Sequence, residues 1–136
     1  MSRSGYSGTP LFKKLGYKPG FKVMVVNEPD NYKDLLLEIP EGVVFGGEGG
    51  EPLDMIHFFT LERIELELEL PKLKEKISKE GMIWVSWPKK SSKVETDVDE
   101  HAVRSTGLLT GLVDIKICAV DEIWSGLKFV YRKKDR

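Results

Sequence analysis

The apolar positions of this sequence follow two different periods. Short runs that are almost wholly apolar are typical of strands buried on both faces, and they predict strands at residues 21–26, 43–45, 54–60 and 81–87. Apolar residues at helical spacing predict helices at residues 11–16, 31–38, 61–79 and 97–109. Two further strands, at residues 112–120 and 127–131, are joined by a turn at residues 121–126. The run 81–87 is the predicted central strand.

Residues 61–79 fit two patterns. Their first half alternates strictly between apolar and acidic residues, as a half-buried strand would. Four apolar residues also fall on one helical face: Leu66, Leu70, Leu73 and Ile77. Leucine and glutamate are good helix formers, and the lysines in the second half suit the C-terminal end of a helix dipole. The sequence therefore favours a helix, which Pro71 kinks or restarts.

Capping residues mark the ends of two helices. In the first, Thr9 is the expected N-cap, Pro10 the first helical residue and Gly16 the stop. Acidic residues from Asp97 onward suit the start of the helix at 97–109, and Gly111 is expected to close it.

The alternation of strands and helices predicts the fold class. Strands separated by helices form right-handed crossovers, which build a mostly parallel sheet with helices on both faces. The short connection at residues 121–126 makes the last two strands an antiparallel hairpin. We therefore expect an α/β protein, a three-layer sandwich with a mostly parallel sheet and a C-terminal antiparallel hairpin.

Composition narrows the function classes. The chain has 136 residues, 40% hydrophobic and 32% charged, which is typical of one globular domain over residues 1–136. We expect the small polar residues 1–8 to be mobile. The formal net charge of -1 provides no field that would attract nucleic acid or an anionic membrane, and neither is an expected partner.

The cysteine and histidine counts limit the chemistry further. Cys118 is alone, which fits a reducing compartment, and no apolar leader precedes the domain, so we expect a cytoplasmic protein. One cysteine and two separated histidines predict no metal site. His57 lies among apolar residues and is interpreted as a core histidine, while Cys118 is interpreted as a small buried residue.

Two resemblances follow from particular segments. The Lys18-Pro19-Gly20 turn before a buried strand, the long helix before residues 81–87 and the closing hairpin resemble a shortened class I methyltransferase. That resemblance implies a Rossmann-like, methyltransferase-like fold, with a sheet in which strand 21–26 lies beside strand 54–59 and strand 82–86 lies beyond it. The family's glycine-rich loop after the first strand is replaced by Val26-Asn27-Glu28-Pro29-Asp30, so S-adenosylmethionine is not carried over and no cofactor is expected.

A second resemblance covers nearly the whole chain. Segments 5–11, 84–90 and 118–128 resemble an uncharacterised bacterial family, domain of unknown function 3052. Membership of that family implies no activity, substrate or catalytic residue.

The predicted strand ends define a candidate binding site. In an open α/β sheet, ligands bind outside the carboxyl ends of the strands. The residues that follow those ends are Asn27, Glu28, Thr60, Ser86, Trp87, Lys89, Lys90, Asp121, Glu122, Trp124 and Ser125. Trp87 and Trp124 are the expected apolar walls, the two lysines the anion contacts, and Glu28, Asp121 and Glu122 the carboxylates. In the alternative interpretation, the tryptophans belong to the core, Asp121 and Glu122 to a turn, and the lysines to a solvated loop.

The sequence leaves three functions open. The first is a non-catalytic module that binds a small ligand or a protein partner at this edge. The second is a small enzyme in which Asp121 or Glu122 is the acid or base and Lys89 or Lys90 holds an anionic substrate. The third is a structural role in which the final hairpin forms a homodimer.

Overall fold

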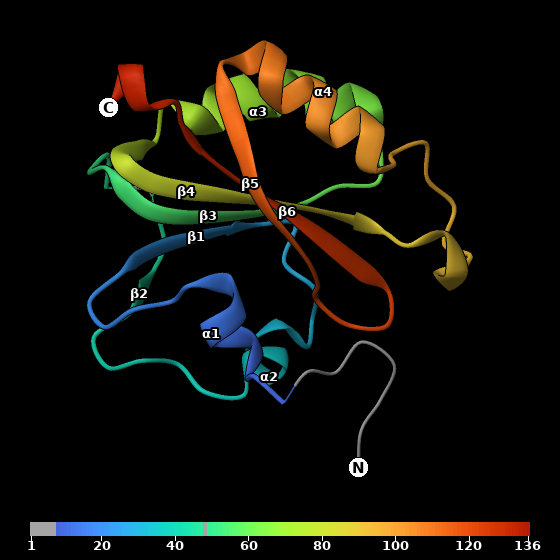
Figure 1. The fold of residues 1–136 in the computed structure, drawn as a ribbon. Coiled ribbons are helices and arrows are strands. Elements are labelled where there is room, and N and C mark those ends of the chain that lie inside the picture. The colour runs from blue at the N-terminus through green and yellow to red at the C-terminus, as the bar shows by residue number, and fades with distance from the viewer. Residues whose placement is uncertain (1–7, 48) are drawn as a thin grey trace.

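One mixed sheet lies between two pairs of helices in the computed structural model, which describes residues 8–47 and 49–136 (Figure 1). In the described part of the chain the six strands, in spatial order, are β2 (Val44–Phe45), β1 (Lys22–Val26), β3 (Leu53–Phe59), β4 (Ile77–Pro88), β6 (Trp124–Tyr131) and β5 (Leu112–Ala119). The α-helices are α1 (Leu11–Leu15), α2 (Tyr32–Leu36), α3 (Arg63–Lys74) and α4 (Glu100–Thr110). Short 3-10 helices follow β4, at Lys90–Ser92, and β6, at Lys133–Asp135.

Strand directions agree with the predicted fold class. The first four strands in spatial order pair in parallel, and β6 is antiparallel to both of its neighbours, β4 and β5. The predicted neighbours β1, β3 and β4 lie side by side. The α/β three-layer fold, with a C-terminal antiparallel hairpin, is confirmed. The expectation that residues 1–8 are mobile falls, apart from Gly8, outside the described residues.

Alternation along β4 divides the apolar core into two clusters. Ile83, Val85 and Trp87 pack with α3 and α4 on one face of the sheet. Trp84 packs with α1 and α2 on the other face, where its Nε1 donates to Leu15 O at 2.8 Å. Because successive side chains of a strand point to opposite faces, neighbours in sequence serve different cores. The predicted central strand is therefore buried on both faces.

The helix predicted at residues 61–79 is shorter than expected. It runs through Pro71 without ending and stops at Lys74, because Ile77 is the first residue of β4 and pairs with Leu53. Pro71 is exposed, and on an exposed face a carbonyl that loses its helical donor can bond to water. Ile77 fits the helical spacing of the apolar residues, yet it is buried as a strand residue.

Other element boundaries move by one to three residues. Pro10 occupies the N-cap of α1, so the assignment of Thr9 to that position is wrong, whereas Gly16 ends the helix at φ 90° as expected. Helix α4 begins after Asp99, whose side chain accepts from the Ala102 amide, and Gly111 closes it at φ 98°. Strand β6 begins at Trp124, three residues before the predicted start.

Strand β1 is less buried than its sequence predicted. Only Val23 among its residues is fully buried, and the next three are half-buried. Strand β2 pairs with β1 only at Lys22 and Val23, so among the described residues no strand pairs with the rest of β1 on that side. None of the described helices combines the length and the apolar character that crossing a lipid bilayer requires.

Candidate functional site

The predicted site residues follow strands that end at one edge of the sheet. Val26 of β1 is level with Phe58 of β3, and Phe59 is level with Ser86 of β4. Pro88 at the end of β4 is level with Trp124 at the start of β6. The side chains, however, separate into a structural joint, a buried chain and an open pocket.

The joint links the ends of β1 and β3. Asn27, at φ 59°, directs its Nδ2 to Phe59 O at 2.8 Å and to Glu65 Oε2 at 2.9 Å. Thr60 Oγ1 donates to the other oxygen of the same carboxylate at 2.7 Å. Glu28, the next residue after Asn27, is exposed. Asn27 and Thr60 thus bind α3 to the sheet edge through Asn27 Nδ2 and Thr60 Oγ1.

Ser86 belongs to a buried chain of hydrogen bonds, not to an accessible site. Its Oγ lies 2.7 Å from His57 Nε2, and His57 Nδ1 lies 2.9 Å from the hydroxyl of Tyr32. That hydroxyl in turn lies 2.8 Å from the hydroxyl of Tyr17. Burial lowers the pKa of His57 to about 3 and raises those of both tyrosines. His57 is confirmed as a core histidine, and the placement of Ser86 among ligand contacts is wrong.

Trp87 and Trp124 do not form two walls of one pocket. Trp87 packs in the cluster under α3 and α4, whereas Trp124 packs on the opposite face, edge to face with Phe59. Pro88, the residue after Trp87, is the one level with Trp124, so Trp87 and Trp124 alternate across the sheet. The two-walled arrangement predicted from the sequence is therefore wrong.

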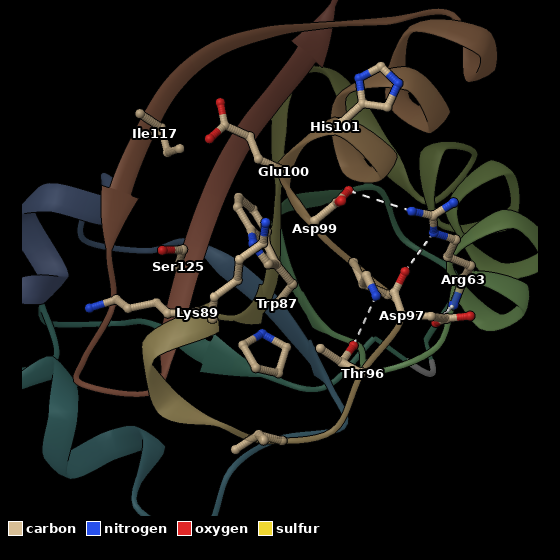
Figure 2. Close-up of a pocket in the computed structure, with 14 residues that line it drawn as sticks. Arg63, Trp87, Lys89, Thr96, Asp97, Asp99, Glu100, His101, Ile117 and Ser125 are labelled. Atoms are coloured by element: carbon tan, nitrogen blue, oxygen red, sulfur yellow. Dashed lines mark hydrogen bonds and ion pairs between the residues drawn. The ribbon is translucent and has the colours of Figure 1, made fainter.

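An open pocket of about 950 Å³ lies where the end of β4 meets the start of α4 (Figure 2). Its apolar lining combines β4, β5 and the loop before α4 through Trp87, Pro88, Val94, Val98 and Ile117. Polar and charged residues complete the lining: Arg63, Lys89, Lys90, Thr96, Asp97, Asp99, Glu100, His101 and Ser125. The volume lies within the range of small-molecule sites, about 300 to 1,000 Å³.

Arg63 joins the loop before α4 to the start of α3 on one side of the pocket (Figure 2). Its backbone amide donates to Asp97 Oδ1 at 2.8 Å, and its Nε donates to the carbonyl of Asp97. Its Nη2 lies 3.8 Å from Asp99 Oδ1. The Ala102 amide, which donates to that same oxygen, holds the pKa of Asp99 below its ordinary value, and Arg63 lowers it further. Arg63 thus holds Asp97 through hydrogen bonds and Asp99 through an ion pair, and these contacts fix the wall.

Two lining residues keep their charged or titratable side chains available. Lys90 and His101 are exposed, and neither side chain forms a hydrogen bond or ion pair with the residues the structure describes. Lys89, in contrast, donates from Nζ to Asp121 O at 2.6 Å. Of the two lysines predicted to contact an anion, Lys90 is therefore the one whose ammonium group forms no hydrogen bond or ion pair with the described residues.

Asp121 and Glu122 form the turn between β5 and β6. Asp121 Oδ1 accepts from the amides of Ile123 and Trp124 at 2.8 and 2.7 Å, a turn stabilised by the residue's own side chain. Glu122 is exposed, and neither carboxylate lines the pocket. The turn interpretation of these two residues is confirmed.

Most of the charged lining was missed in the sequence. Arg63, His101 and the loop at residues 94–98 were not candidates, and Asp97, Asp99 and Glu100 were assigned only to the start of a helix. A usable signal exists in the order of elements. A helix that follows a parallel strand begins at the strand's carboxyl end, so the N-terminal residues of α4 must lie near the end of β4.

The resemblance to class I methyltransferases implies S-adenosylmethionine at the ends of β1 and β3, and the residues there do not fit it. No glycine occurs in the connection at 27–30, so the backbone cannot approach a ligand as closely as a glycine-rich loop does. Pro29 removes an amide donor. The Asn27 side chain also crosses to Phe59 and Glu65 beside the strand ends.

No protein-family model matches the sequence, and no curated protein matches it either. Membership of domain of unknown function 3052 therefore stays a prediction.

Solved structures show the fold relationship. A putative type 11 methyltransferase from Sulfolobus solfataricus superposes with a TM-score of 0.58 at 14% identity, covering 82% of this chain and 85% of that one. Magnesium protoporphyrin IX methyltransferase from Synechocystis PCC 6803 gives 0.57 at 11% identity, covering 84% and 75%. Fibrillarin from Aeropyrum pernix gives 0.53 at 12% identity, covering 90% and 69%. The protein therefore has the α/β fold of the S-adenosylmethionine-dependent methyltransferases.

Proposed function

We propose that this protein is a non-catalytic binding module on a methyltransferase fold, and that it binds a small ligand in the pocket between β4 and α4. The observation that carries the proposal is the Asn27 joint. Its hydrogen bonds to Phe59 O and Glu65 occupy the edge where a methyl donor would bind, while the open pocket lies beyond β4.

The pocket lining supports one chemical class of ligand. Trp87, Pro88 and Ile117 offer an apolar surface of the kind that planar groups cover. Lys90 and His101 offer side chains that form no hydrogen bond or ion pair with the described residues, whereas the carboxylates Asp97 and Asp99 are held by Arg63. The matching ligand is a small planar molecule that carries a carboxylate or a similar acidic group.

A thermal-shift screen tests the proposal with aromatic carboxylic acids and with S-adenosylmethionine. A ligand at 100 times its dissociation constant stabilises a protein by about 2.7 kcal/mol, which raises the melting temperature by several degrees. We expect aromatic acids to raise it, and Lys90→Ala and Val94→Glu to abolish the rise. Lys133→Ala, in the 3-10 helix after β6, is the matched control and should leave the rise unchanged.

The screen also separates the rival functions. A rise with S-adenosylmethionine that depends on Asn27 would replace the binding module with a methyl-transfer function. A rise with aromatic acids that survives both pocket variants would place the ligand elsewhere. No rise with any compound would favour a protein partner, which a pull-down from cell extract would then identify.

A further inference from the structure

Two lysines lie directly opposite each other on the sheet face that α1 covers. Lys116 of β5 and Lys128 of β6 are cross-strand partners. Both side chains reach the C-terminal end of α1. Lys116 Nζ donates to Lys14 O at 3.3 Å. Lys128 Nζ lies beside Gly16, where it would be 3.7 Å from a methyl group added to the glycine. Like charges directly opposite one another destabilise a sheet, so this pair needs an explanation.

Further positive charge surrounds the pair. Lys14 lies on α1, and Lys18 lies on the turn that follows it. Burial lowers the pKa of Lys128, and the charges of Lys116 and Lys18 lower it further. Four lysines therefore gather at the end of α1, and we call them the lysine cluster: Lys14, Lys18, Lys116 and Lys128.

No carboxylate in the described residues neutralises the lysine cluster. None of its members takes part in the ion pairs formed there, and the half-buried ammonium group of Lys128 has no hydrogen-bond acceptor among them. Arg104 shows the usual solution, because it pairs with Glu100 at 2.8 Å and with Asp114 at 3.0 Å. A half-buried cation without a counter-charge indicates that an anion is supplied from outside.

We propose that the lysine cluster binds a phosphate-type oxyanion, on the face of the sheet opposite the β4–α4 pocket. Lysine ammonium groups act as compact point charges, and several of them around one site suit a small dianion better than a planar carboxylate, which arginine binds in two-pronged fashion. Inorganic phosphate and the phosphoryl group of an organic ester share this chemistry.

Thermal unfolding at constant ionic strength tests the site, with sodium phosphate exchanged for sodium chloride at pH 7.5. We expect phosphate to raise the melting temperature of the wild-type protein and to leave the melting temperature of Lys128→Met unchanged. Without phosphate, Lys128→Met should melt above the wild type, because the substitution removes a half-buried charge and its repulsion from Lys116. Lys134→Met, in the 3-10 helix after β6, is the control and should respond to phosphate as the wild type does.

Calorimetric titration with inorganic phosphate and with phenyl phosphate provides a direct reading. We expect Lys128→Met to raise the dissociation constant at least about tenfold, the loss of one charge-assisted contact. Tighter binding of phenyl phosphate would identify an ester as the source of the group, and equal binding would identify free phosphate. Equal responses of all three proteins to phosphate, or no response of the wild type, would overturn the proposal.

Discussion

The side chain of His57 shows how burial sets chemistry at the scale of one residue. Its pKa falls from an ordinary 6.5 to about 3 because the folded protein cannot solvate the imidazolium ion. Between these pH values the unfolded chain binds more protons than the folded one. The stability that neutral His57 contributes is therefore complete above about pH 6.5 and is lost as the pH falls toward 3.

We expect His57→Gln to flatten the pH dependence of stability. Glutamine can still bond to neighbouring hydroxyls but does not titrate, so the slope of unfolding free energy between pH 6.5 and 5 should fall by up to about 1.4 kcal/mol per pH unit. Urea unfolding at several pH values measures this slope. Identical slopes in the wild type and in His57→Gln would contradict the assignment.

Asn27 provides a second residue-scale prediction. Aspartate also tolerates its left-handed backbone, so Asn27→Asp isolates the side chain. The new carboxylate would face Glu65 and the Phe59 carbonyl with no donor, and we expect a loss of about 1–3 kcal/mol in urea unfolding.

Two further variants give this prediction its control. Glu65→Gln supplies an amide and should recover part of the stability lost in Asn27→Asp. Asn31→Asp places the same change at the exposed N-cap of α2, where aspartate is favoured, and should cost little. A loss of equal size at both asparagines would show that the joint does not hold α3.

At the scale of elements, close packing between α4 and β6 explains why glycine, a weak helix former, occupies position 107 in the middle of α4. Its bare backbone lies against the Phe129 ring of β6, and a methyl group there would overlap the ring. Alanine would favour an isolated helix by about 1 kcal/mol. In this protein we expect Gly107→Ala to cost about 1–3 kcal/mol instead, because α4 would have to move away from the sheet.

Thermal unfolding of Gly107→Ala, with Ser105→Ala as a helical control, measures this cost. The control should unfold at or above the wild-type temperature. Adding Phe129→Leu to Gly107→Ala should recover part of the loss, since the smaller side chain leaves room for the methyl group. Stabilisation by Gly107→Ala alone would show that α4 does not depend on this close approach.

Local pattern was sufficient to predict the order and type of the elements, but not all of their ends. Ile77 has the helical spacing of the apolar residues before it, yet it is buried in β4. An apolar residue indicates a buried position but does not tell whether a helix or a strand provides it. Similarly, the early start of β6 depends on the hydrogen bonds of the Asp121 turn, and composition alone does not reveal them. Such boundaries are decided by pairing between segments that are far apart in sequence.

At the scale of the whole molecule, the open pocket lies at the sheet edge where the sequence placed the candidate site, but the predicted residues divide between the two faces of the sheet. The face of the sheet on which a side chain lies depends on strand register, and a change of register by one residue moves the side chain to the opposite face. Trp87 and Trp124 thus separate although both lie at one strand end. The charged pocket wall is formed by Arg63 and Asp97, which meet only when the fold is complete.

The edge of the sheet formed by β5 bears on the homodimer hypothesis, which stays a prediction. Ile115 is an extra residue in β5 that interrupts its pairing with β6, and the exposed Lys116 follows it. A bulge and a lysine both oppose strand addition at an edge. We therefore expect light scattering to find a monomer, and Lys116→Val to promote association. A wild-type dimer that Ile115→Lys dissociates would instead establish this edge as an interface.

The hydrogen bonds that link Tyr17, Tyr32, His57 and Ser86 have a common donor-to-acceptor direction. Neutral imidazole carries one N–H, so His57 donates through one nitrogen and accepts through the other. If Nε2 donates to Ser86 Oγ, then Tyr32 donates to Nδ1 and Tyr17 donates to Tyr32. The other tautomer reverses both bonds of His57 and frees the Tyr32 hydroxyl to donate to Tyr17. A single proton position on His57 thus orients hydroxyl groups from the end of α1 to the middle of the sheet. Replacing Tyr17 with phenylalanine would remove a donor at one end and shift the tautomer balance that Ser86 experiences at the other.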